Sequence, residues 1–162
     1  MKVILVRHAK SDYDWVRWPS DSVRPLSEKG KLRQIKVAKG IIQKNIRFDE
    51  CWVSPYTRAQ QTLEIIQQYQ PNDVPVKINK ELPPFGDPET VLEQIRKESL
   101  AYPSKTILLV GHNPNMSELL ELLSGTPNVP EMRTSDVAIC EINGEETKLI
   151  KYYSRSELYN DN

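Results

Sequence analysis

Three short apolar runs constrain what this chain can fold into, because helical patterns separate them and polar residues follow each one. The runs lie at residues 2–7, 50–54 and 106–111. A buried strand of a parallel sheet has this composition, since helices cover both faces of the sheet and leave no polar side to the strand. Strands that alternate with helices predict an α/β fold with a mostly parallel sheet.

Helical periodicity fills most of the sequence between and after these runs. The expected helices are one that begins near Ser27, 56–69, 88–100 and 114–123. Leu32, Val37 and Ile41 belong to the apolar face expected for the first helix. A short extended piece is expected at 74–78.

The end of the chain follows a different pattern. Two extended runs at 137–142 and 148–153 flank Asn143-Gly144, a dipeptide typical of tight hairpin turns. The chain is therefore expected to form a three-layer α/β/α sandwich whose mostly parallel sheet carries a C-terminal antiparallel hairpin. A length of 162 residues without an internal linker predicts a single domain, residues 1–162.

Charge and cysteine content exclude several classes of protein. The chain has 22 Lys and Arg and 22 Asp and Glu, so its net charge is zero, and binding to nucleic acid or to an anionic membrane is not expected. Cys51 and Cys140 lie in apolar runs without metal-ligand spacing, which predicts buried free thiols and a reducing compartment. No apolar stretch has the length of a membrane span, and the first residues do not show the basic and apolar regions expected of a secretory leader. We expect a cytoplasmic protein in which any anion site is local.

The chain has only two histidines, and both follow apolar runs. His8 comes after Arg7 at the end of the first run, and His112 follows the third. Arg58 lies about one helical turn after the second run. The carboxyl ends of parallel strands meet at one edge of an open sheet, so these side chains are expected to converge on one crevice. Each residue alone has a plainer explanation, as a satisfied polar group or a solvated side chain; their joint occurrence favours a shared site.

Two histidines and two arginines in one crevice predict phosphate chemistry. A guanidinium binds phosphate oxygens through its planar fork, and a neutral imidazole is a nucleophile toward phosphorus. The charge of Arg7 disfavours the imidazolium form of His8, which keeps that ring usable at neutral pH. Arg58 and His112 lie at the starts of expected helices, where free backbone amides favour an anion.

These motifs resemble those of the histidine phosphatase superfamily, which has a phosphoglycerate-mutase-like fold. Residues 5–11 (Leu-Val-Arg-His-Ala-Lys-Ser) are similar to its Arg-His-Gly signature. The block Ser-Pro-x-x-Arg-Ala-x-x-Thr is matched at 54–62, and the second histidine motif at 110–112. Segments 21–30 and 81–87, with the short length, make the chain most similar to the SixA-type phosphohistidine phosphatases. The resemblance covers residues 2 to about 142.

The resemblance implies a role for each matching residue. His8 is the nucleophile that becomes phosphorylated, and Arg7, Arg58 and His112 form the rest of the phosphate pocket. The candidate substrate-binding residues are Ser11, Arg24 and Asn113. The family needs no metal or other cofactor, and no cluster of His, Cys, Asp and Glu here has metal-ligand spacing.

One position departs from the family pattern, and the identity of the general acid is left open. Ala9 replaces the glycine that usually follows the motif histidine, which narrows the backbone freedom there without removing a catalytic group. Glu81 falls where many members carry a proton-donating glutamate, and Asp87 follows it closely. The general acid is therefore Glu81, Asp87 or neither, since the leaving nitrogen of phosphohistidine is itself easily protonated.

Two further segments have alternative explanations. The aromatic residues Tyr13, Trp15 and Trp18 either line the mouth of the pocket or pack a long loop onto the core. The segment 133–135 either faces the site or forms a plain turn, and the turn is favoured.

The sequence as a whole predicts a phosphatase with a phosphohistidine intermediate. Only 22 residues separate Arg58 from Glu81, which leaves little room for a lid and favours phosphohistidine on a protein of the histidine-phosphotransfer type. The alternatives are a phosphatase for a small phosphomonoester and, from another class, a phosphate-binding module without turnover. A monomer is favoured.

Overall fold

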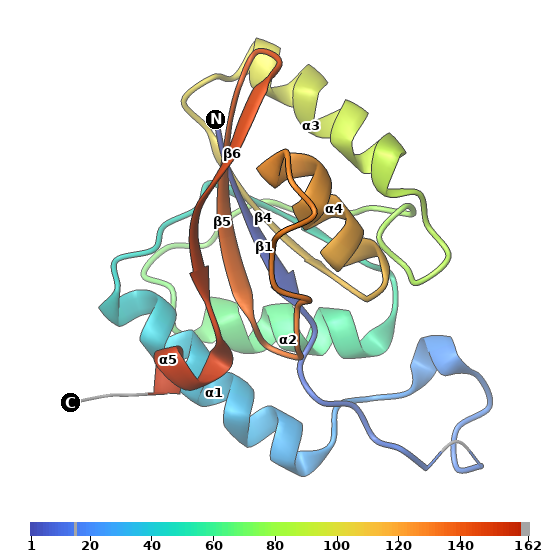
Figure 1. The fold of residues 1–162 in the computed structure, drawn as a ribbon. Helices are drawn as coiled ribbons and strands as arrows, with labels where there is room; N and C mark the ends of the chain where they lie inside the picture. The colour runs from blue at the N-terminus through green and yellow to red at the C-terminus, as the bar shows by residue number, and fades with distance from the viewer. Residues whose placement is uncertain (15, 160–162) are drawn as a thin grey trace.

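A computed structural model describes residues 1–14 and 16–159 (Figure 1). In chain order the elements are β1 (Lys2–Arg7), the short 3-10 helix η1 (Asp21–Val23), α1 (Glu28–Gln43), β2 (Glu50–Val53), α2 (Thr57–Gln68), β3 (Val76–Ile78), α3 (Pro88–Ala101), β4 (Thr106–Gly111), α4 (Asn115–Ser124), β5 (Val137–Asn143), β6 (Glu146–Tyr153) and α5 (Arg155–Tyr159).

The strands of the described residues form one sheet in the order β3-β2-β4-β1-β5-β6. The first four strands along the chain are parallel where they pair, whereas β5 runs antiparallel to β1 and β6 antiparallel to β5. This confirms the predicted α/β fold, a mostly parallel sheet with a C-terminal antiparallel hairpin. The register pairs Leu5 with Leu109 and Arg7 with Gly111, so β1 and β4 end at the same level.

Helices cover both faces of the sheet, as the apolar strands require. Val3 and Leu5 of β1 pack in one core with α3 and α4, while Ile4 and Val6 pack in a second core with α1, α2 and α5. Figure 1 shows these helices on opposite sides of the central strands. Since successive residues of a strand point to opposite faces, β1 has to be apolar along its whole middle.

The predicted turn and two features of the helices differ from the structure. The hairpin turn lies one residue later than expected, because Asn143 pairs with Glu146 and Gly144 takes the positive φ of 63° that the turn requires. Leu32 was expected on the inner face of α1 but is 65% exposed. Gln34 lies inward instead, where its amide oxygen accepts a hydrogen bond from Ser135 Oγ at 2.8 Å.

The last helix, α5, was not predicted from the sequence pattern. α5 is only five residues long, and its Leu158 is buried against α1. The two helices approach so closely that a Cβ at Gly40 would overlap the carbonyl oxygen of Leu158. Five residues are too few to show helical periodicity, so this contact was not predictable from the pattern.

Both cysteines agree with the prediction of buried free thiols. Cys51 and Cys140 are buried in different cores, and burial raises the pKa of each thiol to about 12. Neither thiol is therefore a reactive thiolate at neutral pH. No helix within the two described ranges combines the length and the apolar character needed to cross a membrane.

The contact between α1 and α5 predicts that Gly40→Ala is destabilising. In an open helix this change stabilises by up to about 1 kcal/mol, whereas overpacking here costs about 1 to 3 kcal/mol. Urea unfolding monitored by circular dichroism measures the difference. Leu32→Ala, on the exposed side of α1, is the control and should change the free energy of unfolding by less than about 0.5 kcal/mol. A stabilised Gly40→Ala protein would contradict the close packing.

Candidate active site

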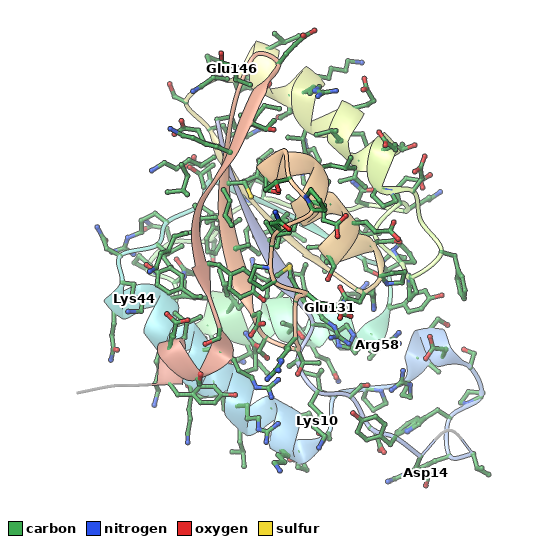
Figure 2. All side chains as sticks on the ribbon, in the orientation of Figure 1. Lys10, Asp14, Lys44, Arg58, Glu131 and Glu146 are labelled. Atoms are coloured by element: carbon green, nitrogen blue, oxygen red, sulfur yellow. The ribbon has the colours of Figure 1, made fainter. Side chains whose placement is uncertain are left out.

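The register of the central strands brings the two histidines together. Arg7 and Gly111 are paired across β1 and β4, so the residues after them, His8 and His112, leave the sheet side by side. The centroids of the two imidazole rings are 4.9 Å apart. Arg58, in the first turn of α2, lies at the same edge of the sheet, where Figure 2 labels it. The structure thus brings together the four residues that the sequence singled out.

His8 is held in one tautomer by the backbone. Its Nδ1 lies 2.6 Å from the carbonyl oxygen of Ala9, and a carbonyl oxygen only accepts hydrogen bonds. Nδ1 therefore donates the proton, and Nε2 keeps a lone pair. Burial, together with the charges of Arg58 and Arg7, lowers the pKa of His8 to about 3, although the hydrogen bond to Ala9 opposes the shift. At neutral pH the ring is therefore uncharged and carries a lone pair on Nε2.

His112 is fixed through its other nitrogen. Its Nε2 lies 2.9 Å from Ser54 Oγ, and its ring makes an edge-type contact with the Tyr56 ring, with centroids 5.1 Å apart. Nδ1 is buried and has no hydrogen-bond partner among the described residues. Burial lowers the pKa of His112 to about 2, with contributions from neighbouring His8 and from Arg58. A second neutral imidazole therefore faces the same space.

Asp21 holds the guanidinium of Arg58 in place. Arg58 donates from Nη1 to the backbone oxygen of Asp21 at 2.8 Å and from Nη2 to Asp21 Oδ2 at 3.1 Å. Its Nε is buried without a partner in the described structure, so a donor remains for a ligand. Asp21 also accepts a hydrogen bond from Arg24 Nη2 at 2.9 Å. One carboxylate thus orients two guanidinium groups, which fixes the direction in which Arg58 Nε points.

Arg7 is half-buried beside a cavity. Its Nη1 donates to the carbonyl oxygen of Met132 at 3.0 Å, and its Nε has no partner among the described residues. Burial lowers the pKa of this guanidinium, while Glu131 and Asp136 oppose the shift. The cavity beside Arg7 has a volume of about 560 Å³, and Arg133 contributes to its wall. Arg133 thus shares a cavity with Arg7, while residues 134–135 form the turn that the sequence favoured.

The three candidate substrate-binding residues have protein partners in this structure. Arg24 is buried and donates to Ser11 Oγ and, at 2.9 Å, to the backbone oxygen of Asp12. Asn113 donates to the carbonyl oxygen of Met132 at 2.8 Å and accepts a hydrogen bond from a residue of α4. Ser11 and Arg24 belong to the cluster around Asp21. Contact of these three residues with a substrate stays a prediction.

The two candidate general acids lie in the loop between β3 and α3. Glu81 Oε2 accepts a hydrogen bond from the backbone N–H of Asp87 at 3.0 Å. Asp87 is the N-cap of α3, where it accepts from the N–H of Glu89 at 3.1 Å, so its position is explained by the helix. The loop packs near His112, because a Cβ at Gly111 would lie 3.3 Å from the backbone oxygen of Leu82. Glu81 as proton donor stays a prediction.

Three residues around this site carry roles that the sequence analysis did not assign. Asp21 anchors two arginines, and Ser54 contacts His112. Thr62 Oγ1 accepts from the backbone N–H of Ala9 at 3.0 Å and donates to the backbone oxygen of Arg58 at 2.7 Å, which ties the end of β1 to α2. The signal was present, since all three lie inside motif blocks that the sequence analysis matched to the family.

The loop between β1 and η1 contains the aromatic residues that the sequence analysis singled out. Tyr13 is exposed, and Trp18 Nε1 lies 3.4 Å from Asp12 Oδ2, a long hydrogen bond within the loop itself. Trp15, which the sequence analysis grouped with them, lies outside the described residues. Among the residues that the structure describes, no three His, Cys, Asp or Glu side chains are grouped as metal ligands. Metal-independent chemistry stays a prediction.

Comparison with known proteins now defines the class. The model of the histidine phosphatase superfamily (branch 1) matches residues 3–99, and this chain belongs to that superfamily. It is a phosphatase of this superfamily and a hydrolase, as the resemblance implied. The fold is phosphoglycerate-mutase-like.

Within the superfamily the chain is similar to SixA proteins. It is 29% identical over 141 residues to the phosphohistidine phosphatase SixA of Escherichia coli (strain K12), covering 85% of this chain and 83% of that protein. The structure of a protein histidine phosphatase SixA complexed with tungstate matches with a TM-score of 0.88, 26% identity and coverage of 98% and 99%. The α-ribazole phosphatase of Shigella flexneri matches with a TM-score of 0.67, 19% identity and coverage of 96% and 97%, which shows the shared fold alone.

The depressed pKa values of the two histidines predict a loss of stability in mild acid. In the unfolded chain each imidazole has a pKa of about 6.5, so below that pH the unfolded state binds more protons than the folded state. Stability therefore falls as the pH falls from 6.5 toward 3, by about 2 kcal/mol per histidine between pH 7 and pH 5. Urea unfolding at both pH values measures this, and His112→Asn should reduce the difference by about 2 kcal/mol. An unchanged pH dependence in that variant would contradict a buried neutral His112.

Proposed function

We propose that this chain removes the phosphoryl group from phosphohistidine on a protein, through a phosphohistidine intermediate on His8. The observation that carries the proposal is the geometry of His8: Nδ1 bonded to the Ala9 carbonyl, Nε2 with a free lone pair, and a ring kept neutral by burial and by two arginines. A satisfied core histidine would need neither a free nitrogen nor cations around it.

The first step transfers the phosphoryl group to His8. Nε2 of His8 attacks phosphorus in line with the substrate's P–N bond, which breaks as the new P–N bond forms, and the leaving imidazole nitrogen takes up a proton. Arg7, Arg58 and His112 hold the three phosphoryl oxygens, so catalysis rests on positioning and on charge stabilisation. Water then attacks phosphorus, the bond to Nε2 breaks, and inorganic phosphate leaves with His8 restored.

The protein substrate follows from what surrounds the site. The interval between Arg58 and Glu81 is occupied by the rest of α2 and by the edge strand β3, which leaves no inserted segment there to cover the histidines. A surface histidine on another protein can therefore approach. The similarity to SixA proteins named for phosphohistidine supports the same substrate class.

Substitution of His8 tests the nucleophile and the substrate together. The wild-type protein should release phosphate from a phosphorylated histidine-phosphotransfer domain with a kcat/KM at least about 100-fold above that for p-nitrophenyl phosphate. His8→Ala should lower both activities by a factor of about 1,000 or more, because the nitrogen that attacks phosphorus is removed and Nε2 of His112 is engaged by Ser54 Oγ. Leu32→Ala serves as the control for folding. Turnover of the small ester alone would move the substrate to a metabolite, and phosphate binding without any turnover would indicate a binding module.

The leaving group decides how much Glu81 contributes. An alkoxide needs a proton donor, whereas the imidazole of phosphohistidine is readily protonated by solvent. Glu81→Gln should therefore lower hydrolysis of an alkyl phosphomonoester by about 10- to 100-fold and that of phosphohistidine by less than about 3-fold. Asp87→Asn, at the N-cap of α3, should leave the hydrolysis of both substrates unchanged. Equal losses on both substrates in Glu81→Gln would contradict this division.

A further inference from the structure

A buried hydroxyl connects the second histidine to the neighbouring strand. Ser54 directly follows β2, is completely buried, and places Oγ 2.9 Å from His112 Nε2. The same Oγ accepts a hydrogen bond from the backbone N–H of Tyr56 at 3.1 Å. Tyr56 is the N-cap residue of α2, so the turn that starts this helix also contacts His112.

The positions of the protons follow from which atoms can donate. A serine hydroxyl has one proton, and in a fully buried site leaving it without an acceptor costs about 1 to 3 kcal/mol. The N–H of Tyr56 can only donate, so it takes one lone pair of Ser54 Oγ. If Oγ also accepted from His112 Nε2, its own proton would have no acceptor among the described residues. If Oγ donates to Nε2, both partners are satisfied, and the imidazole proton lies on Nδ1.

We propose that Ser54 is a positioning residue that holds His112 in the tautomer with its proton on Nδ1, so that His112 offers an N–H to a phosphoryl oxygen. The inference rests on the proposed function, because it names what directs one group of that site. Nδ1 of His112 is buried and has no partner among residues 1–14 and 16–159, so it is the donor that a phosphoryl oxygen would satisfy. The other tautomer would direct a lone pair at the oxygen and repel it.

The two histidines are thus fixed in the same tautomer by opposite means. At His8 an acceptor, the Ala9 carbonyl, takes the proton of Nδ1 and leaves a lone pair on Nε2. At His112 a donor, the Ser54 hydroxyl, occupies Nε2 and leaves the proton on Nδ1. His8 can therefore donate an electron pair from Nε2, and His112 can donate a hydrogen bond from Nδ1. Because both rings stay neutral at pH 7, the tautomer rather than the charge sets these roles.

The chain suits a direct test because it contains only two histidines. Long-range proton–nitrogen correlation spectra of the uniformly nitrogen-15-labelled protein distinguish a protonated from an unprotonated ring nitrogen, and His8→Asn assigns the remaining signals. The expected result at pH 7 is a protonated Nδ1 and an unprotonated Nε2 in His112. A proton on Nε2 of His112 would overturn the inference, whether or not the protein has phosphatase activity.

Variants of Ser54 distinguish a role in positioning His112 from a role in the stability of the protein. Ser54→Ala should give a mixture of His112 tautomers and leave that of His8 unchanged, weaken binding of inorganic phosphate, and lower kcat/KM by about 10-fold, which corresponds to about 1.4 kcal/mol. Ser54→Thr keeps the hydroxyl and should restore the tautomer and most of the activity. Ser99→Ala removes a buried hydroxyl of α3 and is the matched control, with no effect on either histidine.

A double substitution then tests whether Ser54 acts through His112. In the His112→Ala background, Ser54→Ala should change kcat/KM by less than about 2-fold, since the group that Ser54 directs is gone. A full 10-fold loss in that background, or an unchanged His112 tautomer in Ser54→Ala, would overturn the inference. Absence of turnover in the wild-type protein would instead contradict the proposed function, and the spectra would still decide the role of Ser54.

Discussion

The parallel register of β1 with β4 is the constraint on which the rest of the site depends. Because Arg7 pairs with Gly111, the two histidines that follow leave the sheet at the same level and face one another. A slip by one residue would turn every side chain of β1 to the opposite core, so the two apolar cores lock the register. The strands that build the cores therefore also set the distance between the two rings.

Burial at this edge of the sheet gives the two imidazoles their chemistry. Desolvation and the charges of Arg58 and Arg7 lower the pKa of each ring far below neutrality. The same arginines would be stabilised by a bound phosphate, and Asp21 orients Arg58 for that purpose. A site that repels protons and attracts a multiply charged anion suits phosphoryl transfer between nitrogen atoms, the function that we propose.

Sequence patterns predicted much of the fold and the main residues of the site, but not the contacts that orient them. The strands, the hairpin and the convergence of His8 with His112 follow from periodicity and from the geometry of parallel sheets. The inward position of Gln34 and the exposure of Leu32 depend on a tertiary hydrogen bond with Ser135 that no local pattern encodes. The bond between Ser54 and His112 joins residues 58 positions apart, so only the folded sheet reveals it.

The most direct test of the account is to trap the intermediate. The protein is mixed briefly with a radiolabelled phosphohistidine-phosphotransfer domain and quenched in alkali, which preserves phosphohistidine, and the label is then located by peptide mapping and by the isomer of the isolated phosphohistidine. We predict label on His8, with the phosphoryl group on Nε2, because Nδ1 is bonded to the Ala9 carbonyl. Label on His112, attachment at Nδ1, or phosphate release without any labelled protein would contradict the account.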